Sequence, residues 1–185
     1  MNYAEIKHYD IANGPGIRLT LFVSGCRHHC KGCFNEVAWD FNYGKPFTEE
    51  VGQALLDEMQ QSCYEGLTLL GGEPMEPENQ KGLLPLLRHF KERYPDKTIW
   101  CFTGFLFDRD VIGRMMDTLP ETKELLSYID VMVDGKFVQE LKDITLLFRG
   151  SSNQRIIDVP KSLRSGGVVL WEPDASLTYS RRTTQ

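Results

Sequence analysis

Three closely spaced cysteines are the residues best suited to chemistry in this chain of 185 residues. Cys26, Cys30 and Cys33 form a C-x3-C-x2-C array within the segment SGCRHHCKGCFN. Such spacing lets one short loop surround a single centre with three thiolates. The array therefore predicts a metal or cluster site, and the three cysteines are its candidate ligands and its candidate catalytic groups.

Two kinds of centre compete for these thiolates. A zinc ion needs a fourth ligand, which would have to come from His8, His28 or His29. An iron–sulfur cluster of the [4Fe–4S] type would take the three thiolates and leave one iron without a protein ligand. Because the two loop histidines are more typical of exposed residues than of ligands, the spacing favours iron–sulfur over zinc but leaves both open.

The two other cysteines, Cys63 and Cys101, lie at the end of a predicted helix and inside a predicted strand. We expect both to be small buried hydrophobes. Five cysteines, three of them within eight residues, are a poor basis for disulfides. This usage is typical of a reducing compartment such as the cytoplasm.

The composition argues against two classes of partner. Lys and Arg total 21 and Asp and Glu total 26, which gives a net charge of −5. An acidic chain is unsuited to a broad nucleic-acid interface. No run of about 18 apolar residues is present, so we expect no membrane span. The first ten residues also lack the apolar stretch of a secretory signal.

Strand and helix patterns alternate along the chain. Short apolar runs predict four buried strands, at 18–23, 67–70, 98–102 and 129–133, with weaker candidates at 146–148 and 155–159. Helical spacing of apolar residues predicts helices after Thr48, over 83–94 and after Asp108, with Thr48 and Asp108 as N-caps. This alternation is typical of a mostly parallel α/β sheet in one domain.

The unusual residues follow directly after these predicted strands. They are Cys26, Gly71–Glu73, Thr103–Gly104 and Asp134–Lys136. The carboxyl ends of parallel strands lie at one edge of a sheet, where α/β proteins build their active sites. We therefore expect these four clusters to meet at one rim.

The cysteine array after the first strand, with Gly-Gly-Glu-Pro after the second, resembles the radical S-adenosylmethionine (SAM) superfamily. Five segments resemble more closely the activating enzymes of anaerobic, class III ribonucleotide reductases. They are DIANGPGIR (10–18), LFVSGC (21–26), CKGCFN (30–35), VDGKF (133–137) and FRGSSNQ (148–154). The resemblance covers about residues 1–155, and its motifs are specific together rather than singly.

The resemblance implies a fold and a division of the chain. The fold would be an incomplete (β/α) barrel of the radical SAM type. Residues 1–160 would form the activase domain, and residues 161–185 a partly flexible C-terminal extension. Residues 168–171 are a candidate final strand, and the polar end at 176–185 is expected to fray.

The resemblance also implies a site. Cys26, Cys30 and Cys33 would hold a [4Fe–4S] cluster whose open iron binds the amino and carboxylate groups of SAM. Gly71, Gly72 and Glu73 would contact the SAM amino group. The other expected SAM-binding residues are Gly32, Phe34, Asn35, Asp134, Lys136 and Asn153. For Asp134, Lys136 and Asn153 an ordinary polar turn is the competing interpretation.

The implied activity is that of an oxidoreductase, like the formate C-acetyltransferase-activating enzyme. It would cleave SAM reductively and place a glycyl radical on the large subunit of anaerobic ribonucleotide reductase, with electrons from a low-potential carrier such as flavodoxin. The opening that admits a segment of the reductase would be lined by Phe102, Phe105 and Phe107. Of these rings, we expect Phe102 to pack in the core instead. The alternatives are an activase of another glycyl radical enzyme, a small-molecule radical SAM enzyme, and a non-catalytic zinc-binding interaction module.

Overall fold

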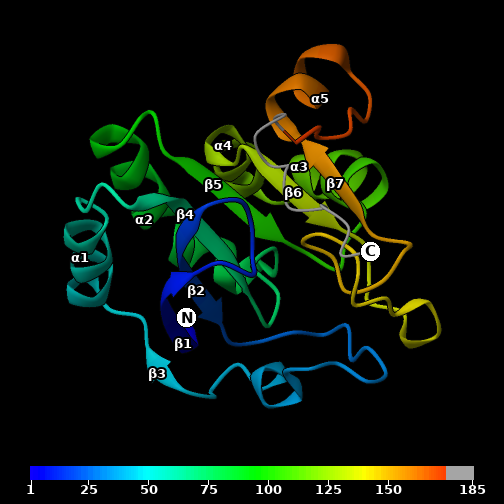
Figure 1. Cartoon of the computed structure of the whole chain (residues 1–185), viewed down its shortest axis with the longest axis horizontal. Coiled ribbons are helices and arrows are strands. Elements are labelled where there is room, and N and C mark those ends of the chain that lie inside the picture. Colours follow the sequence, from blue (N-terminus) through cyan, green and yellow to red (C-terminus); the bar gives the residue numbers. More distant parts are fainter. Residues whose placement is uncertain (174–185) are drawn as a thin grey trace, which may run out of the picture.

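A single open sheet organises the part of the chain that the computed structural model describes, residues 1–173. Its order is β3-β1-β2-β4-β5-β6-β7 (Figure 1). The strands are β1 (Asn2–Asp10), β2 (Ile17–Val23), β3 (Lys45–Pro46), β4 (Tyr64–Gly71), β5 (Thr98–Phe102), β6 (Val131–Asp134) and β7 (Arg155–Asp158). Neighbours among β2, β4, β5 and β6 are parallel, whereas β1, β3 and β7 pair antiparallel. The predicted parallel sheet is thus confirmed at its centre.

Helices fill the connections between these strands. They are α1 (Glu49–Glu58), α2 (Pro77–Arg93), a π-helical segment η2 (Phe107–Met115), α3 (Met116–Thr118), α4 (Pro120–Tyr128) and α5 (Val159–Ser165). Two 3-10 turns, η1 (Glu36–Trp39) and η3 (Gln139–Leu141), lie in the longer loops. Thr48 caps α1 as predicted, because its side chain accepts the Val51 N–H. No helix in residues 1–173 is long and apolar enough to cross a bilayer.

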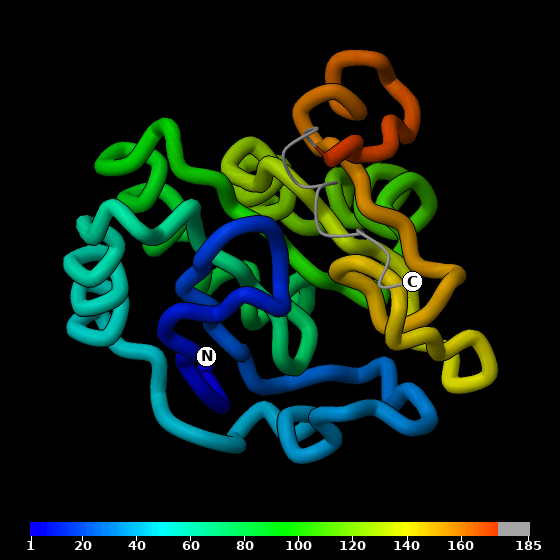
Figure 2. The backbone as a smooth tube through the Cα atoms, viewed as in Figure 1, coloured from blue at the N-terminus to red at the C-terminus, as the bar shows by residue number. Residues whose placement is uncertain are grey.

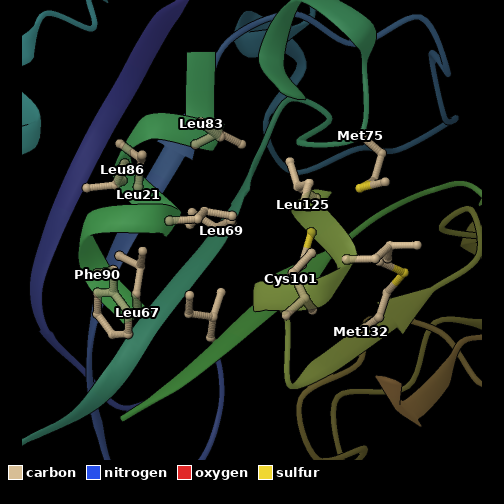
Figure 3. Packing of buried hydrophobic residues seen from close by; sticks show 14 of the residues in the cluster. Leu21, Leu67, Leu69, Met75, Leu83, Leu86, Phe90, Cys101, Leu125 and Met132 are labelled. Carbon is tan, nitrogen blue, oxygen red and sulfur yellow. The ribbon is translucent and has the colours of Figure 1, made fainter. Parts of the chain in front are cut away.

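The main core lies between one face of the sheet and the helices α1, α2, η2 and α4. Alternate residues of each strand point to this face, so leucines and other apolar side chains from neighbouring strands form a continuous layer. Figure 3 shows Leu21, Leu67 and Leu69 of the strands against Leu83, Leu86 and Phe90 of α2.

The opposite face of the sheet carries a second, smaller cluster. Trp100, Val131 and Val133 form it, with Phe148 and Trp171 packed against them. The Trp171 ring lies edge-on to Trp100, with 5.0 Å between centroids. Segment 168–171 therefore returns to the sheet as predicted for a final strand, although only one bridge forms, between Leu170 and Ile157.

Arg18 is fully buried on this second face and connects three strands. Its guanidinium donates to Thr68 Oγ1 at 2.6 Å, to Leu67 O at 2.8 Å and to Thr98 O at 2.9 Å. Burial lowers the pKa of Arg18 to about 10, and no carboxylate of residues 1–173 lies within ion-pair distance. The hydrogen bonds satisfy the cation, because a buried guanidinium without partners would be strongly destabilising.

Several sequence predictions about elements are wrong. Residues 146–148 form turns instead of a strand, and Asp108 does not cap its helix, because its carboxylate binds Arg155. The Leu106 N–H is instead satisfied by Asp110, at 2.9 Å. β1 and α4 had no predicted counterpart. The domain boundary at residue 160 stays a prediction, and the polar end at 176–185 lies outside the described residues.

Candidate metal centre and active site

The three cysteines lie in the loop that follows β2, at the carboxyl end of the parallel strands. Two main-chain hydrogen bonds fix where this loop starts. The Gly25 N–H donates to Ala38 O at 2.8 Å, and the Cys26 N–H donates to Trp39 O at 3.1 Å. The loop therefore leaves β2 and returns through η1 as one closed unit. Inside it, Gly32 has a φ of +70°, a conformation that favours glycine between two cysteines.

Main-chain N–H groups lie beside the three thiols. The N–H groups of His28 and Phe137 act to lower the pKa of Cys26 and Cys30, and the Asn35 N–H donates to Cys33. The last of these places the Asn35 nitrogen 3.4 Å from Cys33 Sγ. Amide N–H groups directed at sulfur stabilise thiolates and tune iron–sulfur centres. This donor set fits three cluster ligands.

Two of these thiols, those of Cys26 and Cys30, lie in a low-dielectric setting. Burial raises the pKa of Cys26 to about 12 and raises the pKa of Cys30 above its ordinary value. These thiols are neutral at pH 7 in the metal-free chain. Metal binding must therefore release their protons, as is general for thiolate ligands.

A cavity of about 520 Å³ joins the cysteines to the ends of the neighbouring strands. Cys26, Cys30 and Cys33 line it, together with the Gly71–Glu73 segment after β4. Gly32 and Phe34 also line it, as does segment 142–144 after β6. Figure 2 shows the blue loop after β2 extending toward the yellow segment after β6. The cavity is large enough for a small-molecule cofactor.

The placement of the thiols fits the ligand set of a cluster. In a [4Fe–4S] cluster each thiolate binds a different iron atom, so the sulfurs need to border one cavity. Cys26, Cys30 and Cys33 all line the same cavity, as three such ligands would.

The histidines considered as zinc ligands are engaged elsewhere. His8 lies 2.7 Å from Glu58 in a separate part of the chain, and the His29 ring packs edge-on against Trp39. His28 was expected to be exposed, but its side chain is only 8% exposed and lies 2.9 Å from Glu73. His28 lines the main cavity, and its Nε2 is occupied by this contact.

The structure brings some of the predicted SAM-binding residues together and places the others elsewhere. The cavity brings together Gly32, Cys33, Phe34 and the Gly71–Glu73 segment. Asp134 is fully buried and pairs with Arg155 at 2.5 Å, which joins β6 to β7, and its contact with SAM stays a prediction. Lys136 and Asn153 line a smaller neighbouring cavity, and Asn35 lines neither.

Other expectations about single residues also change. Phe102 lines the main cavity, whereas Phe107 is 3% exposed and belongs to the core, which reverses the predicted assignment of these two rings. Cys101 is fully buried as expected, but Cys63 is exposed. Cys63 is therefore a surface thiol instead of a packed hydrophobe.

Sequence reasoning missed Glu76 and Asn79, which are buried and bind the cysteine loop. It also missed Phe137, whose main-chain N–H faces Cys30. The signal available for the first two was the run of polar residues at threefold spacing in EPMEPEN, just after the Gly-Gly pair. The role of Phe137 depends on its main chain, so no side-chain pattern could indicate it.

Comparison with known proteins gives consistent matches. A family model described as "4Fe-4S single cluster domain" matches residues 12–157. The chain is 42% identical over 158 residues to the anaerobic ribonucleoside-triphosphate reductase-activating protein of Haemophilus influenzae, covering 84% of this chain and 97% of the relative. Proteins of the same name in Escherichia coli K12 and Enterobacteria phage T4 are 41% and 40% identical, covering 83% and 84% of this chain and 96% and 93% of their own lengths.

Proposed function

The chain belongs to the family of anaerobic ribonucleoside-triphosphate reductase-activating proteins, and from this premise we propose that it places a glycyl radical on that reductase by cleaving SAM. The observation that carries the proposal is the shared cavity, in which three thiols and the Gly71–Glu73 segment face the same space. As an enzyme it would be an oxidoreductase, like the activating enzyme of formate C-acetyltransferase.

The cofactor would be a [4Fe–4S] cluster on Cys26, Cys30 and Cys33, with SAM bound to its open iron. When bound and reduced by an external donor, the cluster would supply the one electron that cleaves the S–C5′ bond of SAM to methionine and a 5′-deoxyadenosyl radical, which would take a hydrogen atom from a glycine α-carbon of the reductase. The protein provides orientation and excludes water.

The chain's own residues would divide this work. The amide donors on the three sulfurs support the anionic form of the ligands. Gly71 and Gly72 let backbone approach the cavity without side chains in the way. Leu70, Phe102 and Phe148 give the cavity an apolar wall that keeps water from a reactive radical.

The substrate would be a polypeptide segment from the reductase. Two of the most exposed apolar side chains of residues 1–173, Phe34 at 80% and Ile144 at 90%, line the cavity from the loops after β2 and β6. Exposed apolar groups around a site are typical of protein recognition. A protein segment therefore accounts for these side chains better than a small polar substrate does.

Three finer features belong to the same proposal. The sheet would be an incomplete (β/α) barrel of the radical SAM type, with its second face turned to the cavity. The electron donor would be a low-potential carrier such as flavodoxin. The reaction would take place in the cytoplasm, where thiols stay reduced.

The test is anaerobic mixing of the reconstituted protein with SAM, a reductant and the large subunit of the reductase. We expect a glycyl doublet in electron paramagnetic resonance (EPR) that needs all four components. SAM cleavage without a doublet would point to another glycyl radical enzyme or to a small-molecule substrate. Absence of iron and sulfide after reconstitution would contradict the proposal itself.

A further inference from the structure

Two buried carboxylates hold the two residues that follow Cys26. The Arg27 N–H donates to Glu76 Oε1 at 2.9 Å, and the Arg27 guanidinium pairs with the other oxygen of the same carboxylate. His28 Nε2 lies 2.9 Å from Glu73 Oε2. Both glutamates come from the loop between β4 and α2 and are at most 3% exposed.

The Glu73 carboxylate is fully engaged inside the protein. Its Oε1 accepts the Met75 N–H at 2.9 Å, and its Oε2 accepts the Gly104 N–H at 2.7 Å in addition to the contact with His28. One side chain thus joins the ends of β4 and β5 to the cysteine loop.

Asn79, in the first turn of α2, completes the connection. Its amide nitrogen donates to Ser24 O at 3.0 Å and to Glu73 O at 2.9 Å, and the residue is fully buried. The Glu73 N–H also donates to Gly25 O at 2.9 Å. Glu73, Glu76 and Asn79 lie at intervals of three residues. Together they fix both main chain and side chains around Cys26.

We propose that Glu73, Glu76 and Asn79 form a polar anchor that positions the cysteine loop, and that Glu73 acts through His28 and Gly104 instead of binding the SAM amino group. The inference rests on the proposed function, since it assigns these positioning residues to the cluster site. The expected contact between Glu73 and SAM is thereby reassigned.

The energetics favour this assignment. To reach an ammonium in the cavity, Glu73 would have to release buried partners, and each unsatisfied buried group costs about 1–3 kcal/mol. The existing partners, by contrast, hold the loop in place before any cofactor binds. Residues that orient metal ligands in this way commonly change metal affinity by about 10- to 100-fold when they are removed.

The experiment uses the full chain, reconstituted anaerobically, as wild type, Glu73→Gln, His28→Ala and the double variant. Two quantities are measured without SAM: the rate of iron release to a ferrous chelator, and the EPR spectrum of the reduced cluster. We expect each single variant to release iron at least about tenfold faster and to show an altered spectrum. The double variant should release iron no faster than the single variants, because both remove the same link.

Two matched controls separate positioning from general damage. His28→Gln retains a side-chain hydrogen-bonding group at this position, and we expect it to restore the wild-type rate and spectrum. Glu78→Gln removes the other carboxylate bound to Arg27, which is 50% exposed, and should leave both quantities unchanged. Far-UV circular dichroism of the metal-free variants checks that each one folds, and His28→Ala carries the test if Glu73→Gln does not.

The following results would contradict the proposed role of the polar anchor. If Glu73→Gln kept the wild-type iron release and spectrum without SAM but bound SAM more weakly, Glu73 would be a direct SAM contact. Additive effects in the double variant would show that His28 and Glu73 act separately. A wild-type chain that binds no iron would contradict the proposed function as well, which distinguishes the two failures.

Discussion

At the scale of single residues, the thiols differ in environment although their side chains are identical. Cys26, Cys30 and Cys33 line one cavity, Cys63 is exposed, and Cys101 is buried in the core. We expect Cys26→Ala, Cys30→Ala and Cys33→Ala each to abolish SAM cleavage, since the loop has no spare thiolate. Iron content and SAM cleavage are the measurements, and Cys63→Ala is the matched control that should match wild type. Full activity in any of the three loop variants would refute the ligand assignment.

Gly72 shows how close the two loops approach. A Cβ atom there would lie 2.5 Å from Gly25 O and 2.8 Å from Ala38 O. The geometry predicts that Gly72→Ala displaces the cysteine loop and lowers iron content together with SAM affinity, at a cost in stability of about 1–3 kcal/mol.

Iron per chain and SAM binding by equilibrium dialysis measure these two effects. Gly167→Ala is the control, because a Cβ atom at Gly167 meets no atom within 4 Å. Normal iron content in Gly72→Ala would mean that the loops yield more easily than their contacts indicate.

At the scale of elements, one arginine connects β7 to β6 and to η2. Arg155 binds the fully buried Asp134 at 2.5 Å and the exposed Asp108 at 2.9 Å. Arg155→Met leaves a buried carboxylate without its cation, so we expect a loss of about 3–5 kcal/mol in the free energy of unfolding. Urea denaturation measures it, and Arg88→Met, which breaks an exposed pair with Glu124, should cost under about 1 kcal/mol.

The ion pair between Arg155 and Asp108 predicts how a fall in pH changes the free energy of unfolding. The hydrogen bond from Arg155 holds the pKa of Asp108 below its ordinary value of 3.8. Because the folded pKa is lower than the unfolded one, the stabilisation is complete above the ordinary value and is lost as pH falls through the folded pKa. Below about pH 4, wild type should therefore lose stability more steeply than Arg155→Met. Parallel slopes in urea titrations at several pH values would contradict this.

At the scale of the whole molecule, the exposed apolar side chains at the cavity offer a test of partner recognition. Ile144→Asp places a charge where the reductase is proposed to bind, and we expect radical transfer to fall at least tenfold while SAM cleavage without the partner is unchanged. EPR of the glycyl radical and product analysis measure these two activities. Leu163→Asp, at an exposed leucine on α5, is the control. An equal loss of radical transfer in Ile144→Asp and Leu163→Asp would contradict the proposal that Ile144 belongs to a reductase-binding surface.

The central strands could be predicted because parallel strands covered on both sides are continuous apolar runs, as in LTLFV and LTLL. β1 could not, since β3 pairs only with its first two residues, and the exposed Lys7 and His8 further along break the apolar pattern. The cysteine positions follow from local spacing. The partner of Asp134 is Arg155, which lies 21 residues away in the sequence, so local spacing does not indicate the pair. A motif alone also does not reveal which of its side chains face the cavity.

All three thiols belong to one eight-residue stretch, while the main core is built by strands and helices outside it. A cluster bound there would cross-link only a short piece of chain. It would therefore reduce the conformational entropy of the unfolded chain only slightly and add little to the stability of the fold. Maturation would then follow a defined order, with a polypeptide that has already folded acting as the acceptor of iron and sulfide. Oxidative loss of the centre would be repairable, because the empty protein would keep the shape needed to be loaded again.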